Sequence, residues 1–183
     1  MPIILINGKK RSGKDYFAEL LKKELEEQDV SVEIIAFADS IKDILCTSLG
    51  IDLDTFNEYK NDREPIVMNG KEYNDVRTFI QKFGTEAMQT AFGKSVWVDV
   101  FLKKVEKSFA AYIIVPDFRF KHEFIKGSHT IQVINGYLKS NDSHASETEL
   151  DEFKFQYQVD NTGHPDLIPI VRKYVKKLGF WFG

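Results

Sequence analysis

Cysteine is nearly absent from this 183-residue sequence, in which Cys46 is the single thiol. One cysteine cannot form an internal disulfide, and such sparse use of cysteine is typical of proteins in a reducing compartment. Cys46 lies within residues 41–49, where apolar side chains recur at helical spacing. We therefore interpret it as a core residue rather than a reactive nucleophile.

Long hydrophobic runs and an excess of positive charge are also missing. No segment approaches the roughly 18 consecutive apolar residues that span a bilayer, and the first apolar run stops at residue 6, which is too early for a signal peptide. The net charge of −3 and the pI near 5.8 argue against general binding to nucleic acid or to an acidic membrane. We expect a cytoplasmic protein, in the host cytoplasm if it is viral, with no nucleic-acid or membrane partner.

Glycine and positive charge are concentrated at residues 8–15, which read Gly-Lys-Lys-Arg-Ser-Gly-Lys-Asp. An apolar run at residues 3–6 precedes this stretch, and an amphipathic segment at residues 16–27 follows it. Strand, glycine-rich loop and helix in this order predict a phosphate-binding P-loop. The glycines permit a tight turn whose N–H groups face an anion, together with the positive end of the helix dipole. Lys14 can then reach the β- and γ-phosphates of a nucleotide.

Asp15 stands where a P-loop usually carries Ser or Thr, whose hydroxyl binds Mg²⁺. A carboxylate can also hold this cation, directly or through a water, because Mg²⁺ prefers oxygen ligands and retains several waters. Without a cation, the same carboxylate would repel phosphate. Asp15 is therefore a candidate metal residue, and it makes the predicted site more dependent on Mg²⁺.

Strands alternate with helices along the chain. Apolar runs predict strands at residues 3–6, 30–37, 112–115, 129–134 and 155–159. Helical spacing predicts helices at residues 16–27, 40–49, 96–109 and 167–178, with a short helix from Lys121. This alternation predicts an α/β fold, a P-loop three-layer α/β/α sandwich with a parallel sheet. We expect a single domain whose core comprises about residues 1–38 and 96–183, with a helical insertion at about 39–95 and a mobile loop at about 137–150.

The predicted insertion begins with polar residues 51–73, for which no fixed structure is expected beyond a tight turn or hairpin at residues 68–71. Asn74 is the predicted N-cap of a long helix that runs to about residue 91. Its apolar stripe consists of Val76, Phe79, Ile80, Phe83 and Ala87. The neighbouring polar face carries Arg77, Gln81 and Thr85, spaced four residues apart.

Ligands of parallel sheets bind at the carboxyl ends of the strands. The P-loop, Asp39 and Asp117 each follow a predicted strand, so we expect them to converge at one edge. Four cations could surround a phosphoryl group during transfer, namely Lys14, Arg11, Arg77 and Arg119. Arg119 and Glu123 are spaced four apart, as in a pair that orients the guanidinium or as in a solvated surface salt bridge.

Several motifs that would indicate other functions are missing from the sequence. It lacks the Asn-Lys-x-Asp of GTPases, the Asp-Glu that ends a strand of motor ATPases, and the His-Arg-Asp set of protein kinases. Its four histidines show no metal-ligand spacing, which argues against zinc. A small phosphotransferase is the class that best fits the motifs present.

Further motifs follow the P-loop in a fixed order. They are Arg-x-x-x-Gln-x-x-Gly-Thr at residues 77–85, Trp97, Ile-Val-Pro-Asp-x-Arg at 114–119 with Glu123 beyond it, Lys-Ser-Asn-Asp-x-His at 139–144, and Asp-Asn-x-Gly at 160–163. This series resembles the bacteriophage deoxynucleoside monophosphate kinases, which are P-loop NMP-kinase-like enzymes, over almost the whole chain. The phosphomevalonate-kinase-like branch of the same superfamily shares only part of the set.

The resemblance implies transfer of the γ-phosphoryl group of ATP to a deoxynucleoside monophosphate (dNMP), with Mg²⁺ as the cofactor. We expect a monomer or homodimer. The resemblance also implies catalytic roles for Lys14, Arg119 and Arg11. The implied ATP-binding residues are Gly8, Lys10, Arg11, Ser12, Gly13, Lys14, Asp15 and Asn161, with Asp15 near the metal. The implied substrate-binding residues are Lys42, Arg77, Gln81, Trp97, Asp117 and Glu123. The loop at 137–150 would be a lid that carries Lys139, Asp142 and His144.

Two other functions are compatible with the sequence. One is a kinase for another small molecule, such as phosphomevalonate. The other is a phage protein that binds a nucleotide without catalysis, although retention of Lys14, Asp15, Arg77 and Arg119 together argues against this. The insertion before Asn74 is short, so the preference among bases stays open. From its residue type and position alone, Trp97 reads more readily as core than as a base-stacking platform.

Overall fold

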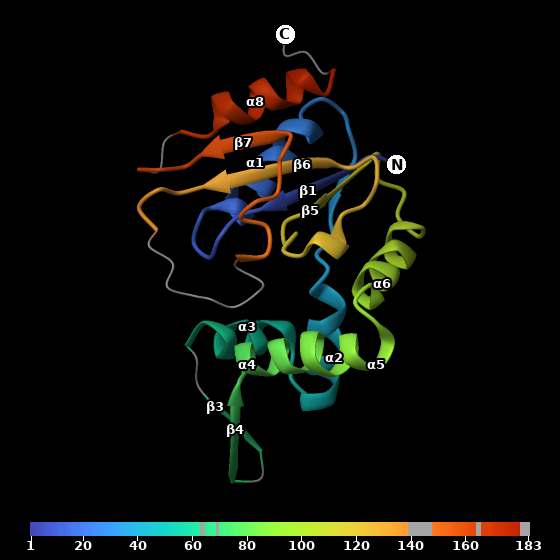
Figure 1. The fold of residues 1–183 in the computed structure, drawn as a ribbon, viewed down its shortest axis with the longest axis vertical. Helices are drawn as coiled ribbons and strands as arrows, with labels where there is room; N and C mark the ends of the chain where they lie inside the picture. Colours follow the sequence, from blue (N-terminus) through green and yellow to red (C-terminus); the bar gives the residue numbers. More distant parts are fainter. Residues whose placement is uncertain (63–64, 69, 139–147, 164–165, 180–183) are drawn as a thin grey trace. The chain divides into compact units, whose positions relative to one another are not determined.

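The computed structural model describes residues 1–62, 65–68, 70–138, 148–163 and 166–179 (Figure 1). The chain divides into two compact units, which are described separately below. The sheet unit consists of Met1–Ala36 and Lys104–Gly183, and the helical unit consists of Phe37–Lys103. Among the described residues, no helix is both long and apolar enough to cross a membrane.

The sheet unit is built on five parallel strands in the order β2-β5-β1-β6-β7. They are β1 (Ile3–Asn7), β2 (Val32–Ile34), β5 (Tyr112–Val115), β6 (His129–Ile134) and β7 (Tyr157–Asp160). This arrangement confirms the predicted α/β fold with a parallel sheet flanked by helices. The chain passes from β5 to β6 across β1, so the strand order switches at β1, which is where such sheets bind ligands.

Two helices cover one face of this sheet, α1 (Lys14–Glu26) and α8 (Ile168–Lys177). The apolar stripes of these helices include Phe17, Leu21 and Val171. They pack on alternate residues of the strands, such as Ile4 and Ile131. The intervening strand residues, such as Leu5 and Ile113, are also fully buried, as is typical of a parallel sheet covered on both faces.

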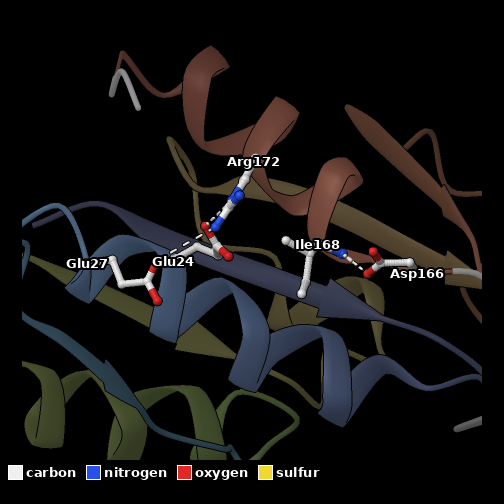
Figure 2. Close-up of polar contacts among 5 residues, drawn as sticks. All are labelled: Glu24, Glu27, Asp166, Ile168 and Arg172. Atoms are coloured by element: carbon white, nitrogen blue, oxygen red, sulfur yellow. Dashed lines mark hydrogen bonds and ion pairs between the residues drawn. The ribbon is translucent and has the colours of Figure 1, made fainter. Parts of the chain in front are cut away.

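A polar contact joins α1 to α8 (Figure 2). The Arg172 Nε atom lies 2.8 Å from Oε2 of Glu24, whose side chain is buried, and Nη2 of Arg172 lies 3.9 Å from Glu27. Asp166 accepts a 3.0 Å hydrogen bond from the Ile168 N–H and so satisfies a free donor at the start of α8. The helix that follows the P-loop is therefore fixed against the last helix of the chain.

Some predicted bounds in the sheet unit were too long. The strand predicted at residues 30–37 pairs only over Val32–Ile34, because the chain then leaves the sheet for the helical unit. Helix α6 (Val96–Val105) ends before residue 109 and leaves Phe109 fully exposed. Ser108 explains this end, since its hydroxyl bonds to Glu33 at 2.6 Å and accepts the Ala110 N–H, in competition with helical bonding.

The helical unit contains α2 (Asp39–Leu49), α3 (Leu53–Asp62), the hairpin of β3 (Pro65–Met68) and β4 (Lys71–Asp75), α4 (Val76–Gln81), a π-helix (Lys82–Met88), α5 (Gln89–Phe92) and most of α6. The predicted hairpin at 68–71 is confirmed, whereas the expectation of no fixed structure in the rest of 51–73 was wrong. Asp52 caps α3 by accepting the Thr55 N–H at 2.7 Å, and Phe56 and Ile66 anchor this segment in the core. Cys46 packs against the same core, as interpreted from the sequence.

The long helix predicted from Asn74 needs two corrections. Asn74 belongs to β4, and Asp75 is the residue that caps the helix, because its carboxylate accepts the backbone N–H and the hydroxyl of Thr78 at 3.1 and 2.8 Å. The π-helix widens the turn, which shifts the buried stripe by one position after Phe83. Ala87 is consequently exposed, and Met88 packs on the core in its place.

Candidate active site

The predicted P-loop, residues 8–15, begins where β1 ends, and its tight path depends on two glycines. A Cβ on Gly8 would collide with Oγ of Ser12 and come within 2.9 Å of the Val133 carbonyl. Gly13 adopts a left-handed backbone conformation with φ of 89° immediately before α1, and a side chain there would collide with the Asn161 amide. The loop therefore lies close against β6 and the turn after β7, and α1 begins at the next residue.

Lys14 and Asp15 form an ion pair at the start of α1. The Lys14 Nζ atom lies 3.0 Å from Oδ2 of Asp15, and the two side chains are 10% and 76% exposed. The ammonium is thus held close to the loop, while the carboxylate faces solvent. Arg11 adopts a positive φ of 64° and is exposed, whereas Ser12 is 1% exposed and its hydroxyl has no hydrogen-bond partner among the described residues.

Two asparagines connect the P-loop to neighbouring strand ends. Asn161, which follows β7 and is buried, donates from Nδ2 to the Ser12 carbonyl at 2.8 Å. Asn7, at the end of β1, donates from Nδ2 to the Phe118 carbonyl at 2.8 Å, and the Phe118 N–H bonds to the Ile6 carbonyl. The P-loop, the turn at Asp117 and the turn at Asn161 are thereby brought together at the carboxyl edge of the sheet.

Glu123 determines the shape of the turn that carries Asp117 and Arg119. It is 6% exposed, and its Oε2 accepts the backbone N–H groups of Arg119 and Phe120 at 2.7 and 2.9 Å. Sequence spacing predicted a pairing of the two side chains. In the structure the carboxyl group bonds to the main chain of Arg119, and the nearby guanidinium adds electrostatic attraction.

Burial and, to a smaller extent, the neighbouring Asp117 carboxylate raise the pKa of Glu123 to about 8. The two backbone N–H groups and the Arg119 charge oppose this shift without cancelling it. The carboxyl group is therefore largely protonated at neutral pH. A neutral acid can keep both backbone hydrogen bonds while avoiding the free-energy cost of a buried charge.

We expect Glu123→Gln to retain the turn, since the amide oxygen can accept the same two N–H groups. Between pH 4.5 and pH 8 the folded protein binds more protons at this position than the unfolded chain, so the free energy of unfolding of the wild type should fall as pH rises. The free energy of unfolding of the Gln variant should not fall in this way. By pH 8 it should have risen by up to a few kcal/mol relative to that of the wild type.

Urea denaturation at pH 5, 6, 7 and 8 measures this difference. Glu149→Gln is the matched control, because Glu149 accepts a single backbone N–H, from Lys121 at 2.9 Å. Parallel pH profiles for the wild type and Glu123→Gln would show that Glu123 is ionised in the folded protein at neutral pH.

Four of the predicted substrate-binding residues belong to the helical unit. Lys42 lies in the first turn of α2, where its Nζ is 2.8 Å from Oδ1 of Asp39, and Gln81 is the last residue of α4. Trp97 is 5% exposed and donates its indole N–H to the Gly84 carbonyl at 2.8 Å, so most of its ring is core. Arg77 is placed in α4 by its backbone. Their roles stay predictions.

The lid residues Lys139, Asp142 and His144 lie outside the described residues. Residues 151 and 153, which follow the predicted lid residues, contact the P-loop and the turn at Asp117. Lys9 of the P-loop lies 3.1 Å from Asp151, and Phe153 packs edge-on against Phe118 with ring centres 5.4 Å apart. Sequence reasoning missed Asn7, Lys9 and Asp151. A polar residue that ends an apolar strand, as Asn7 does, is the one signal that could have indicated it.

The family model for phosphomevalonate kinase matches residues 6–132, which is more than half of the chain and includes the P-loop and the turn at Asp117. The chain belongs to the phosphomevalonate kinase family. The matched range of this family also includes the whole helical unit, but it ends before Asn161.

The deoxynucleotide monophosphate kinase of Enterobacteria phage T4 is 32% identical to this member of the family over 92 residues. The aligned region is 46% of this chain and 38% of the T4 protein, so the chain spans well under half of that relative's length. This match confirms the resemblance inferred from the ordered motifs.

Proposed function

We propose that this protein transfers the γ-phosphoryl group of ATP to a dNMP, giving dNDP and ADP. Membership of a family named for a kinase supports phosphoryl transfer, and the name of the T4 relative supports a deoxynucleotide acceptor. The single observation that carries the proposal is the connection between the P-loop and the Asp117–Arg119 turn through Asn7. It joins a phosphate-binding loop to the end of the adjacent strand, at the switch in strand order.

The donor site and the acceptor site of the proposed reaction need different groups from the protein. Backbone N–H groups of the P-loop and the Lys14 ammonium suit the β- and γ-phosphates of the donor. Arg119 lies in the turn that follows β5. This strand pairs with β1, and paired strands lie about 4.8 Å apart. A cation at that spacing suits the region between donor and acceptor, and Arg77, Lys42 and Gln81 of the helical unit are proposed for the acceptor.

The reaction itself requires little from the protein beyond positioning and charge. An oxygen of the acceptor phosphate forms a bond to the γ-phosphorus, and the bond from that phosphorus to the bridging oxygen of ADP breaks. A monophosphate is largely dianionic near neutral pH, since its second pKa is about 6, so no general base is needed. Exclusion of water and fixed cations then account for catalysis.

Mg²⁺ is the proposed cofactor, and Asp15 is the residue proposed to hold it. The exposed carboxylate beside the P-loop is an oxygen donor of the type that Mg²⁺ binds, with phosphate oxygens and waters as the other ligands. The described residues contain no cluster of three or more His, Cys, Asp or Glu side chains suited to a metal ion. A metal at Asp15 would therefore depend on bound nucleotide. When bound, it would neutralise charge on the phosphates.

Asp15→Asn is expected to raise the Mg²⁺ concentration needed for half-maximal activity by on the order of tenfold or more, because an amide oxygen carries no net charge. Glu19→Gln, one turn further along α1 and exposed, is the matched control and should leave the titration unchanged. Activity of each variant is measured across a Mg²⁺ series at saturating ATP. Superimposable curves for Asp15→Asn and the wild type would remove Asp15 from the metal site.

The family name gives phosphomevalonate as a second candidate acceptor. A screen with coupled detection of ADP distinguishes the candidates, with dTMP, dGMP, dCMP, dAMP, the corresponding ribonucleotides and phosphomevalonate as acceptors. Turnover with one or more dNMPs above the rate without acceptor is the expected result. Turnover with phosphomevalonate alone would assign the second function, and ATP binding without turnover on any acceptor would indicate a nucleotide-binding protein without kinase activity.

A further inference from the structure

An exposed aromatic side chain follows β6, the strand that pairs with β1, and has no role in the proposed reaction. Tyr137 is 75% exposed, and it begins the segment predicted from the sequence as a mobile loop, although the backbone at this position is hydrogen-bonded. Its N–H bonds to Oδ1 of Asn135 at 3.1 Å, and Asn135 itself is buried. The ring is therefore exposed from a hydrogen-bonded turn, which leaves a large aromatic surface open to solvent.

The Tyr137 turn and the P-loop follow neighbouring strands of the sheet. The turn follows β6, which pairs with β1 on one side and β7 on the other. Strands of a sheet are about 4.8 Å apart, so the P-loop, the Tyr137 turn and the Asn161 turn follow one another over roughly 10 Å along the carboxyl edge. A nucleotide whose phosphates occupy the P-loop would place its base at about this distance from them.

Contacts between the Tyr137 turn and the 161–163 turn determine where the Tyr137 ring lies. The Gly136 N–H donates to Oγ1 of Thr162 at 2.7 Å, and the Asn161 N–H donates to the Ile134 carbonyl at 2.7 Å. A Cβ built on Gly163 would lie 3.7 Å from Cε2 of Tyr137, so the ring lies against the 161–163 turn. Asn161 in turn bonds to Ser12, which connects this pair of turns to the P-loop.

We infer that Tyr137 forms the base subsite of the phosphoryl donor, with the purine of ATP stacked on its ring beside the 161–163 turn. This inference rests on the proposed function, because it requires the phosphates to occupy the P-loop. Stacking on an exposed aromatic ring is a recurrent way to bind a nucleobase, and it uses the ring face rather than hydrogen bonds to the base edge. Tyr137 is accordingly proposed as a binding residue with no part in the chemical step.

The test compares a ligand that has a base with one that does not. Binding of ATP and of inorganic tripolyphosphate, each with Mg²⁺, is measured by isothermal titration calorimetry for the wild type, Tyr137→Ala and Tyr137→Phe. We expect Tyr137→Ala to weaken ATP binding by about 5- to 100-fold and to leave tripolyphosphate binding within about twofold. Tyr137→Phe retains the ring and should bind ATP within about threefold of the wild type.

Phe109→Ala is the matched control. Phe109 is a fully exposed aromatic of the same unit, but it precedes β5 and so belongs to the opposite, amino edge of the sheet. Its removal should change neither affinity. Steady-state kinetics provides a second measurement, in which Tyr137→Ala should raise KM for ATP and leave kcat and the KM of the acceptor unchanged.

Four results would overturn the inference, and they differ in what they say about the proposed function. Equal ATP affinity in the wild type and Tyr137→Ala, or wild-type binding of tripolyphosphate as tight as that of ATP, would exclude a base subsite at Tyr137 while leaving the P-loop function intact. Equal losses of ATP and tripolyphosphate binding in Tyr137→Ala would show that Tyr137 only supports the loop. Wild-type protein that binds neither ligand would contradict the proposed function itself.

Discussion

Replacing Lys14 with alanine is expected to lower kcat/KM by roughly 10²–10³-fold or more, the largest effect predicted for this protein. The ammonium is held within the P-loop at the start of α1, with only 10% of the side chain exposed. In the proposed reaction it would lie beside the β- and γ-phosphates of the donor. Alanine would remove this charge from the place where the proposal has negative charge move during transfer.

Steady-state rates and ATP affinity are both measured for this variant, with Lys22→Ala as the control. Lys22 lies in the same helix, and its Nζ is 3.8 Å from Glu26 in an exposed pair of the kind that contributes little to stability. The control should behave as wild type. A Lys14→Ala enzyme within tenfold of wild-type kcat/KM would contradict the assignment of the P-loop as the donor site.

Arg119→Lys is expected to lower kcat by on the order of 10²-fold or more, with little change in either KM. Charge that develops on the oxygens around the moving phosphorus is the target proposed for the guanidinium. Lysine retains the positive charge but loses the planar arrangement of donors, so the two residues are not equivalent at a bidentate site. Glu123 fixes the main chain of Arg119, which favours a defined position for the side chain.

Arg172→Lys is the matched control for this substitution. Arg172 belongs to the same unit and makes its own short contact with a carboxylate, Glu24, away from the P-loop (Figure 2). This control should affect stability modestly and leave kcat unchanged. A normal kcat with a raised KM for the acceptor would show that Arg119 only anchors the substrate, and normal values of both would reduce it to a structural residue.

The elements that were correctly predicted depend on local patterns. The runs at residues 3–6 and 112–115 are apolar on both faces, because they lie in the middle of a covered parallel sheet, and the structure places them in β1 and β5. Two glycines between strand and helix likewise determine the tight turn of residues 8–13 over a few residues. Such signals are contained within single segments, so they can be seen before any tertiary contact is known.

The wrong predictions occur where distant contacts decide the conformation. Residues 51–73 are polar and lack periodicity, but Phe56 and Ile66 find a core supplied by other segments, and α3 and the hairpin form around them. The π-helix that moves Ala87 out of the apolar stripe also has no signal in the sequence. Helix α6 ends early because Ser108 bonds to Glu33, which lies 75 residues away.

The sequence by itself determined a glycine-rich turn at the end of the first strand, a parallel α/β sheet, and the ordered motifs that resemble those of phage deoxynucleoside monophosphate kinases. Only the tertiary structure decided which of these segments contact one another. It showed that Glu123 bonds to the main chain of the Arg119 turn, that Asn7 and Asn161 join three strand ends, and that Tyr137 lies exposed at the same edge. The reason is physical: local pattern selects secondary structure, whereas burial and hydrogen bonding between distant segments depend on where the folded chain brings them.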